Sequence, residues 1–318
     1  MVMAQSLFKT IKADQPDALI DVLAPAWSLP LLKRMPEVNQ GLHMPIGHGS
    51  FSLMERYRVG YNLQPNAYTQ AIVTPRSLKS ALVPFFARIP VRTGYRGEMR
   101  FGLINDMRKL KKSVLTQTVQ RQVALGLDKT VKLPPPIPAP RLTVDKQNQQ
   151  RLLEKFTLHL DRPVVGLIPG AAYGPAKQWP LENFRKLATQ LVNLGKQVWV
   201  IGSENEIPLG DSIAALHPDA IFSLCGRTRL EDAIDLMDCM QSVVTNDSGL
   251  MHVACAVDKP VIAIYGSSSP AYTPPLSDKA KILYLDLSCS PCFKRQCPLG
   301  HTKCLADITP AQVLEKLP

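Results

Sequence analysis

One segment of the sequence, TNDSGLMHVA over residues 245–254, combines residue types that bind phosphates and sugars. A β-branched run precedes it and a helical pattern begins near Ser248 or Gly249, so the segment is predicted to lead from a strand into a helix. The first N–H groups of a helix lack partners within the helix and lie at the positive end of its dipole. Gly249 would let a phosphate approach this backbone, Ser248 could donate to a phosphate oxygen, and Asp247 could accept hydrogen bonds from sugar hydroxyls. His252, one turn farther along, completes a candidate anion site.

The same residues also have a simpler interpretation. Asp and Ser are common N-cap residues, so Asp247 or Ser248 could merely cap the helix while His252 packs inside. Taken alone, the segment favours this capping interpretation.

A second segment, PGAAYGPAKQWP over residues 169–180, also follows a predicted strand and leads into a predicted helix. Gly170 and Ala171 leave room for a ligand beside the backbone, and Lys177 could neutralise a departing phosphate. The segment is not a Walker A loop, which requires Gly-Lys-[Ser/Thr] after a spaced glycine. Each segment alone is a weak signal, but two such loops on one sheet support each other.

The second half of the chain has the element pattern needed to bring these loops together. Short apolar runs alternate with helical patterns, which indicates an α/β fold with a parallel sheet covered by helices on both faces. The predicted strands are 164–168, 197–201, 221–224, 243–245 and 261–265, and the predicted helices are 180–194, one ending near 216, 230–240 and 249–256. Ligands bind beyond the carboxyl ends of the strands in such sheets. Each loop after a strand is therefore a candidate site.

The first half is less regular, and a proline-rich segment, LPPPIPAP over residues 133–140, separates it from the second. We predict one domain over residues 1–145 and another over 146–318. The predicted strands of the first half are 19–23 and 71–74, and its predicted helices are 2–12, 29–34, 52–61 and 77–86. A doubly wound domain normally begins with a strand, and none precedes the first helix. We therefore expect the first strand of this domain to be absent from the sequence.

The charge and hydropathy of the chain limit its partners. The 37 Lys and Arg residues against 26 Asp and Glu give a formal charge of +11, which favours an anionic partner. Much of the excess lies in residues 88–112, which could equally form a solvated face. No apolar run is long enough for a membrane-spanning helix, and the N-terminus lacks the pattern of a signal peptide, so a cytoplasmic location is expected.

At this point the sequence resembles a known family. The stretches NDSGLMHVA, PGAAYGPAKQWP, APAWSLPLLKRMPEV and LKSALVPFFARIPVRTGYRGEMR are similar to the ADP-heptose:lipopolysaccharide heptosyltransferases, especially those of type II. The similarity continues to the closing DITPAQVLEKL. It implies the GT-B architecture, in which two Rossmann-like domains face each other across a cleft, an acceptor-binding one over 1–145 and a donor-binding one over 146–318. It also implies inverting transfer of L-glycero-D-manno-heptose from ADP-heptose to the first heptose of the inner core.

The resemblance assigns roles to individual residues. Lys177 would contact the donor phosphate, Glu206 the ribose hydroxyls, Thr228 and its neighbours the adenine, and Asp247 the donor sugar, with Lys177 and Asp247 as the catalytic residues. With Gly170 and Ala171 from the residue pattern added to the residues that the resemblance implies, the complete candidate donor site is Gly170, Ala171, Lys177, Glu206, Thr228, Asp247, Ser248, Gly249 and His252. No cofactor and no catalytic metal are expected, because the family displaces ADP without one.

The acceptor implied by the resemblance is heptosyl-Kdo2-lipid A, an anionic lipid, at the cytoplasmic face of the inner membrane. Arginine suits bidentate recognition of carboxylates and phosphates. The candidate acceptor contacts are Arg76, Lys79, Arg92, Arg96 and Arg100.

One departure from the family concerns the general base. In the family, an aspartate in a Gly-rich loop after the first strand serves as the proposed base, and this chain begins after that point. Because a positioned base typically contributes about 10²–10⁴-fold in rate, we expect the chain as given to bind ADP and to catalyse poorly.

Four cysteines and a histidine near the end of the chain form a second cluster, in the sequence CSPCFKRQCPLGHTKC over residues 289–304. Thiolates and imidazole can close a tetrahedral zinc site, although the spacing C-x2-C-x4-C-x6-C is not a standard finger or ribbon. Reduced thiols packing a loop are the alternative, since disulfides are disfavoured in the cytosol. The remaining cysteines, Cys225, Cys239 and Cys255, are predicted to be core residues.

Three other functions stay open at this stage. The chain could be another GT-B enzyme that uses a nucleotide-sugar, such as the type I heptosyltransferases, or a catalytically impaired truncated form. It could also be a basic nucleic-acid-binding protein, but aromatic residues make up only 6% and are not interleaved with the basic run, so nucleic acid is not the expected partner.

Overall fold

The computed structural model describes residues 1–47 and 49–318, which divide into two compact units. The N-terminal unit comprises Met1 and Met3–Pro138, and the C-terminal unit comprises Val2 and Ala139–Pro318. The division falls inside the proline-rich segment, a few residues before the predicted boundary at 145. Every helix in the described ranges is too short or too polar to serve as a membrane-spanning segment.

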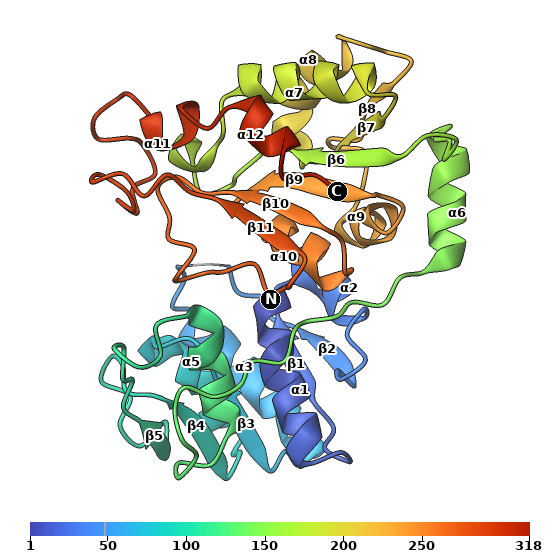
Figure 1. Cartoon of the computed structure of the whole chain (residues 1–318). Coiled ribbons are helices and arrows are strands. Elements are labelled where there is room, and N and C mark those ends of the chain that lie inside the picture. Colours follow the sequence, from blue (N-terminus) through green and yellow to red (C-terminus); the bar gives the residue numbers. More distant parts are fainter. Residues whose placement is uncertain (48) are drawn as a thin grey trace. The chain divides into compact units, whose positions relative to one another are not determined.

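The C-terminal unit is built on a six-stranded sheet in which every described pairing is parallel (Figure 1). The strand order is β11-β10-β9-β6-β7-β8. The strands are β6 (Val164–Ile168), β7 (Gln197–Val200), β8 (Ile221–Ser223), β9 (Ser242–Asn246), β10 (Val261–Ile264) and β11 (Ala280–Leu283). The predicted parallel sheet is therefore confirmed, with β11 as a strand that the sequence patterns did not predict.

The strand order of this sheet contains a topological switch point. From β6 the chain moves outward through β7 to β8, then returns to β9 on the other side of β6 and moves outward through β10 to β11. The carboxyl ends of β6 and β9 are adjacent, because Ile168 pairs with Thr245. Crevices at such a point are the usual ligand sites of open α/β sheets.

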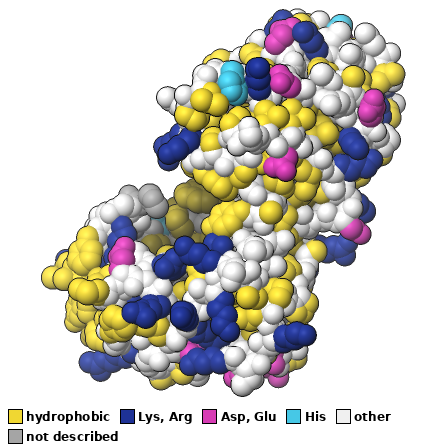
Figure 2. Space-filling view, turned by 60° about the vertical axis from the view of Figure 1, so that its left-hand side comes forward, with side chains coloured by type: hydrophobic (Ala, Val, Ile, Leu, Met, Phe, Trp, Pro, Cys, Tyr) yellow, Lys and Arg dark blue, Asp and Glu magenta, His cyan; other side chains and the backbone are white. Residues whose placement is uncertain are grey.

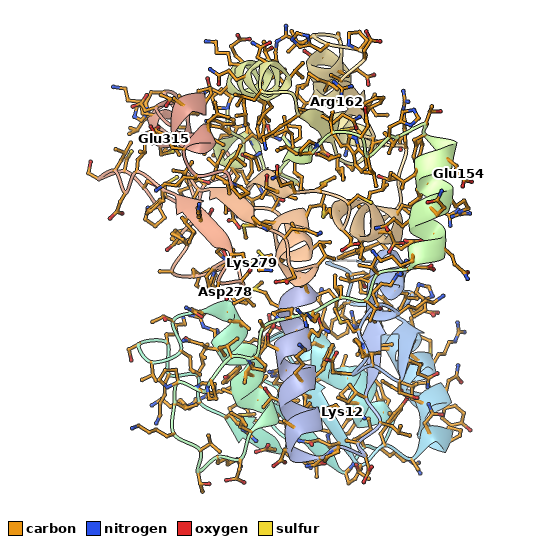
Figure 3. The ribbon with its side chains drawn as sticks, turned by 45° about the vertical axis from the view of Figure 1, so that its right-hand side comes forward. Lys12, Glu154, Arg162, Asp278, Lys279 and Glu315 are labelled. Carbon is orange, nitrogen blue, oxygen red and sulfur yellow. The ribbon has the colours of Figure 1, made fainter. Side chains whose placement is uncertain are left out.

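Helices cover both faces of the sheet, with α7 and α8 on one face and α9 and α10 on the other (Figure 1). The helices of this unit are α6 (Lys146–Lys155), α7 (Leu181–Asn193), α8 (Ile207–Ala214), α9 (Leu230–Met237), α10 (Gly249–Ala256), α11 (Lys303–Ala306) and α12 (Pro310–Leu314), with 3₁₀ turns η5 (Pro175–Lys177) and η6 (Glu204–Glu206). Their amphipathic patterns direct this placement. On α6, for example, Leu152 is buried while Glu154 is exposed (Figure 3).

The core of the C-terminal unit holds strands β6 and β9 and the loop after β6 in place. All five residues of β6 and of β9 are buried, as expected for strands covered on both faces. Trp179 lies just before α7, is fully buried, and packs edge-to-face on Phe184 with ring centroids 4.8 Å apart. Its indole N–H donates to the carbonyl of Ile308 at 2.8 Å. The loop after β6 is thereby anchored at its far end.

The N-terminal unit contains two short parallel sheets, of order β1-β2 and β3-β4-β5. Its strands are β1 (Asp21–Ala24), β2 (Gln40–His43), β3 (Gln70–Val73), β4 (Val91–Tyr95) and β5 (Asp106–Arg108). Its helices are η1 (Val2–Ala4), α1 (Gln5–Asp14), η2 (Ala26–Ser28), α2 (Leu29–Leu32), α3 (Leu53–Leu63), η3 (Gln64–Asn66), η4 (Leu78–Ala81), α4 (Leu82–Phe86) and α5 (Thr118–Gly126). The Tyr68 hydroxyl donates to Asp21 at 2.5 Å and so bridges from the residues before β3 to β1.

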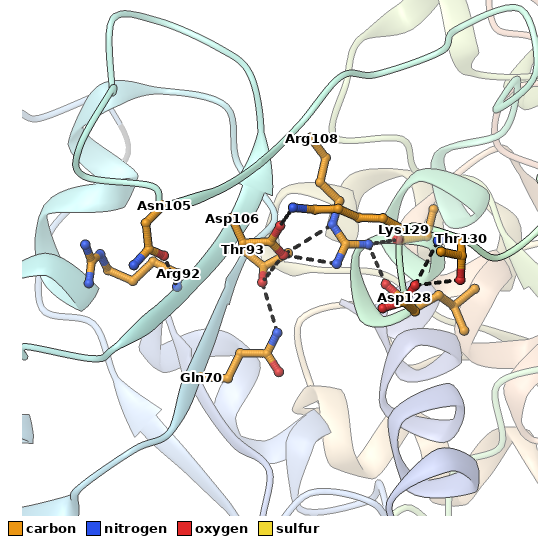
Figure 4. Close-up of polar contacts among 11 residues, drawn as sticks. Gln70, Arg92, Thr93, Asn105, Asp106, Arg108, Asp128, Lys129 and Thr130 are labelled. Atoms are coloured by element: carbon orange, nitrogen blue, oxygen red, sulfur yellow. Dashed lines mark hydrogen bonds and ion pairs between the residues drawn. The ribbon is translucent and has the colours of Figure 1, made fainter.

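A polar network joins β3, β4 and β5 (Figure 4). Asp106 accepts hydrogen bonds from Thr93 at 2.8 Å and Arg108 at 3.0 Å and pairs with Lys129 at 2.6 Å, while Gln70 donates to Thr93 at 2.9 Å. Burial alone would raise the pKa of Asp106, but the hydrogen bonds from Lys129, Thr93 and Arg108 outweigh it and lower that pKa. Arg108 therefore stabilises the unit rather than contributing to a solvated basic face.

Candidate functional site

The two candidate loops meet at the switch point of the C-terminal sheet. Lys177 follows β6 and Asp247 follows β9, and the Lys177 Nζ lies 2.5 Å from Asp247 Oδ2. The Asp247 side chain is only 6% exposed and that of Lys177 18%, so solvent screens the pair weakly. The structure thus brings together the two residues to which the resemblance assigns catalytic roles.

Asn246, the last residue of β9, holds the loop after β6 in place. Its amide donates to the carbonyl of Pro169 at 2.8 Å, and its side-chain oxygen accepts from the backbone N–H of Trp179 at 2.9 Å. The residue is completely buried. The sequence analysis gave Asn246 no role, although a polar side chain ending an apolar strand was the signal that could have found it.

The start of α10 is the candidate anion site. Ser248 is the N-cap residue, with an extended backbone, and within the described chain its side chain makes no capping hydrogen bond. Asp247 instead pairs with Lys177. The structure therefore does not support the interpretation of these two residues as simple caps. A Cβ added to Gly249 would meet no heavy atom of the described residues within 4 Å, which leaves open space in front of the helix.

His252 lies half-buried in the first turn of α10. Burial lowers the pKa of its imidazole to about 4, and the nearby charge of Asp247 opposes this shift. Its Nδ1 is a buried atom for which the described residues supply no hydrogen-bond partner. At neutral pH this histidine is therefore uncharged and can interact with a ligand through a hydrogen bond rather than as a cation.

Glu206 extends the site to the end of β7. Its carboxylate accepts hydrogen bonds from the backbone N–H of Ser203 at 2.6 Å and from the Ser203 hydroxyl. A Cβ added to Gly170 would lie 2.5 Å from the Glu206 Cδ, so the glycine makes room for this carboxylate. The sequence analysis had explained Gly170 by the approach of a ligand. The structure adds a second reason, which is that a side chain at this position would collide with Glu206.

The remaining donor candidates lie along the same edge of the sheet. Ala171 is buried in the loop after β6. Thr228 follows β8, where its hydroxyl donates to the Leu224 carbonyl at 3.4 Å, and Gly226 in the same turn has φ +69°. Because β9, β6, β7 and β8 are consecutive in the sheet, their loops form one continuous row.

A tyrosine and an arginine that the sequence analysis did not single out complete the surroundings of Lys177. The Lys177 Nζ lies 5.1 Å from the centroid of the Tyr173 ring, and the Arg295 guanidinium lies 5.5 Å from the same ring. The Ala176 N–H donates to the Arg295 carbonyl at 3.1 Å. The ring therefore holds two cations at this edge of the sheet, one of them from the cysteine-rich segment.

The five acceptor candidates of the N-terminal unit differ in exposure. Arg76 and Arg96 are exposed, and Lys79 and Arg92 are half-buried. Arg92 donates to the Leu103 carbonyl at 2.7 Å, whereas the Arg96 guanidinium lies 5.9 Å from the Phe101 ring centroid.

Arg100 differs from the other four because it is completely buried. It donates to the carbonyls of Pro75 at 2.8 Å and Tyr95 at 2.5 Å. Its contact with an acceptor stays a prediction, which this burial does not favour.

The comparisons with known proteins agree on one family. A model of "Glycosyltransferase family 9 (heptosyltransferase)" matches residues 56–303. The chain is 48% identical to the lipopolysaccharide heptosyltransferase 2 of Salmonella typhimurium and 46% identical to that of Escherichia coli, each over 326 aligned residues. Both matches cover 100% of this chain and 94% of the relative. The solved structure of E. coli ADP-heptose lps heptosyltransferase II has a TM-score of 0.88 and 43% identity, covering 99% of this chain and 93% of that one.

These matches also bear on the fold and on one earlier expectation. The likeness to the solved heptosyltransferase II confirms the GT-B fold class. Because the relatives match the whole of this chain, the comparisons give no support to the expectation of a missing first strand. The chain belongs to glycosyltransferase family 9, the heptosyltransferases.

Proposed function

We propose that this chain transfers L-glycero-D-manno-heptose from ADP-heptose to the first heptose of the lipopolysaccharide inner core, with inversion at the anomeric carbon. The observation that carries the proposal is the Lys177–Asp247 pair at the switch point, beside the start of α10. A diphosphate placed there would meet a lysine ammonium and unpaired helix N–H groups together. Two carboxylates that would accept from sugar hydroxyls, Asp247 and Glu206, lie on the same row of loops.

In the reaction, the bond between the anomeric carbon and the diphosphate oxygen breaks while the acceptor hydroxyl bonds to the opposite face of that carbon. The acceptor hydroxyl releases its proton to solvent as its oxygen becomes the glycosidic oxygen, and negative charge develops on the departing ADP. Lys177 and the N–H groups at the start of α10 stabilise that charge. Groups aimed at developing charge in a partly buried site are each worth about 10²–10³-fold in rate.

Before the donor binds, the ion pair holds both side chains ready. Lys177 is kept at the sheet edge by Asp247, so it is not free to rotate into solvent. When a diphosphate approaches, it competes for the ammonium, and an Asp247 oxygen becomes available to accept from a heptose hydroxyl. Ser248, Gly249 and the uncharged His252 would complete the pyrophosphate contacts.

The nucleoside would lie farther along the row, over the ends of β7 and β8. Glu206 would accept from the two ribose hydroxyls, with Gly170 beside its carboxylate and Ala171 next in the same loop. The turn containing Gly226 and Thr228 would contact the adenine. A carboxylate is a natural partner for a diol because its two oxygens accept in parallel.

We propose that the N-terminal unit binds the heptosyl-Kdo2-lipid A acceptor and contacts the cytoplasmic face of the inner membrane peripherally. Figure 2 shows Lys and Arg side chains beside hydrophobic ones on one face of this unit. Phe101 is 65% exposed next to Arg96, and Phe85 is 42% exposed with the Arg92 guanidinium 5.7 Å from its ring centroid. Exposed aromatic and cationic side chains together suit an anionic lipid surface.

The test is a transfer assay with ADP-heptose and heptosyl-Kdo2-lipid A on the full chain and on Lys177→Ala. We expect transfer by the unaltered chain and a loss of about 10²–10³-fold in kcat in the variant, since a charge-stabilising group is removed. The matched control is Lys186→Ala, an exposed lysine on α7. Transfer from UDP- or GDP-sugars but not from ADP-heptose, or full activity in Lys177→Ala, would overturn the proposal.

A further inference from the structure

Two loops of the N-terminal unit, residues 74–81 after β3 and residues 96–104 after β4, begin at the same edge of a parallel sheet. Val73 pairs with Gly94, so both loops start where neighbouring strands end. Ligands of parallel sheets bind beyond this carboxyl edge. Three of the candidate acceptor contacts lie in these loops, and we call them the edge cations: Arg76, Lys79 and Arg96.

The backbones of the two loops are in direct contact. The Glu98 N–H donates to the Arg76 carbonyl at 3.3 Å, and the Arg76 Nε donates to the Arg96 carbonyl at 3.3 Å. The Glu98 carboxylate accepts from the Leu78 N–H at 2.7 Å. A Cβ added to Gly97 would lie 2.0 Å from the Arg76 carbonyl oxygen. The close approach of the loops therefore depends on the absence of a side chain at position 97.

Arg100 joins the two loops from inside the unit. Its side chain is completely buried. One terminal nitrogen donates to the Pro75 carbonyl at 2.8 Å and to the Ser80 hydroxyl at 3.2 Å, both in the loop after β3. The other donates at 2.5 Å to the carbonyl of Tyr95, the last residue of β4. The planar fork of one guanidinium thus spans both loops, which the point charge of an ammonium cannot do.

The charge of Arg100 has only neutral hydrogen-bond acceptors within residues 1–47 and 49–318, which are three carbonyl oxygens and one hydroxyl. Its Nε is a buried donor for which the same residues supply no partner. Burial and the nearby charge of Arg76 lower the pKa of the guanidinium, and Glu98 opposes them. Arginine still stays protonated at neutral pH. A buried charge lowers stability unless opposite charge lies near it, so this edge of the sheet favours an anion.

We propose that Arg100 is a positioning residue for the acceptor: without touching it, Arg100 sets the spacing of the edge cations to match anionic groups of the acceptor. The inference rests on the proposed function of the N-terminal unit. Arg76 and Arg96 are exposed and can each form a bidentate contact with a carboxylate or phosphate. Because such contacts require a fixed orientation, they depend on the loops that Arg100 joins.

The first experiment compares Arg100→Lys with the unaltered chain in the transfer assay, with acceptor and donor varied in turn. We expect the acceptor KM to rise about ten-fold, the effect of losing one charge-assisted hydrogen bond, while kcat and the donor KM stay unchanged. Lysine keeps the charge but not the fork, so it should not restore acceptor binding.

The matched control for this experiment is Lys132→Ala, which removes an exposed cation of the same unit outside both loops and should change none of the three constants. The melting temperature of each variant is measured alongside. If Arg100→Lys lowers kcat and the melting temperature while both KM values stay as in the unaltered chain, Arg100 only stabilises the fold and the proposal is overturned.

A second variant separates the loops while Arg100 stays in place. Gly97→Ala brings a Cβ against the Arg76 carbonyl, and we expect the acceptor KM to rise with the donor KM unchanged. In the double variant with Arg100→Lys, the rise should be smaller than the product of the two single effects, because both act on the same loop spacing. An unchanged acceptor KM in Gly97→Ala, or a full product in the double variant, would overturn the shared role.

A third measurement distinguishes this inference from the proposed function. Binding of heptosyl-Kdo2-lipid A in detergent micelles to the full chain is measured without ADP-heptose, and we expect a Kd about ten-fold higher in Arg100→Lys than in the unaltered chain. An equal Kd would overturn the role of Arg100 even where the unaltered chain transfers heptose. Weaker binding by the variant, with no transfer by the unaltered chain, would count against the proposed reaction and support the role of Arg100. No acceptor binding by the unaltered chain would overturn both.

Discussion

The two units hold their candidate site residues in different ways. In the C-terminal unit, Lys177, Asp247 and Glu206 stand at the ends of buried parallel strands, and fully buried Asn246 fixes the loop that carries the lysine. In the N-terminal unit, the cationic side chains extend from short strands and turns, and several are exposed. Substitutions at the site of the C-terminal unit should therefore cause large losses of stability or activity. Substitutions among the exposed cations of the N-terminal unit should cause small, graded losses.

The largest effect on stability is expected for Asn246→Ala. The substitution leaves the buried Trp179 N–H and the Pro169 carbonyl without their partner, which costs about 2–4 kcal/mol of the free energy of unfolding. Urea denaturation measures it, and the exposed Asn193→Ala at the end of α7 should stay within about 0.5 kcal/mol of the unaltered chain. An equally small change for Asn246→Ala would show that the Asn246 hydrogen bonds do not hold the loop after β6.

A smaller loss is expected for Asp106→Asn in the N-terminal unit. The amide cannot pair with Lys129 and Arg108 as the carboxylate does, and we expect a loss of about 1–3 kcal/mol at neutral pH. The folded pKa of Asp106 is lowered, so this contribution is present above the unfolded pKa and is lost as the pH falls through the folded one.

Urea denaturation of Asp106→Asn and of the unaltered chain at several pH values tests this assignment. The two stabilities should converge as the pH falls below the ordinary range for aspartate. Exposed Asp17→Asn is the control and should show no such convergence. Parallel curves for Asp106→Asn and the unaltered chain would contradict the network.

Membrane binding by the N-terminal unit is expected to weaken by a small amount for each exposed cation that is removed. Arg96→Ala removes one exposed cation beside Phe101 and should weaken binding to anionic vesicles by about 1 kcal/mol, or roughly five-fold. Arg162→Ala, in the C-terminal unit (Figure 3), should leave vesicle binding unchanged. Equal losses in the two variants would show that the contact is not localised in the N-terminal unit.

The last effect concerns His252 and appears only in acid. Burial lowers its pKa to about 4, so the unfolded chain takes up a proton that the folded chain does not when the pH falls below about 6.5. Stability from this group is thus full above the unfolded pKa and declines between about pH 6.5 and 4. His252→Gln should flatten the melting temperature across that interval. Identical pH profiles for His252→Gln and the unaltered chain would refute the assignment.

Much of the C-terminal unit could be predicted from residue patterns alone. The run at 164–168 and the helix at 249–256 coincide with β6 and α10, because each is a compact apolar pattern with a clear beginning and end. Pro180 before α7 and Gly195 after it, with φ +75°, mark that helix as expected. Cys225 and Cys255 are buried as predicted, while Cys239 is only half-buried.

The patterns failed where elements are short or polar. β5 has only three residues, Asp106–Arg108, two of them charged, and its place is fixed by pairing with β4 and by the hydrogen bonds to Asp106. β2 and β11 carry exposed residues and are strands because a neighbour pairs with them. Such edge strands depend on contacts distant in sequence, which local propensity does not contain.

The sequence by itself determined which residues could bind a donor: two loops with a lysine, an aspartate and glycines, each following a strand. Only the tertiary structure decided that Lys177 and Asp247 form a pair, although they are 70 positions apart. Their contact depends on β9 returning to lie beside β6, and the order of strands is set by how the whole sheet buries its apolar faces. The same return aligned Asn246 with Trp179 across 67 positions and so fixed the loop between them.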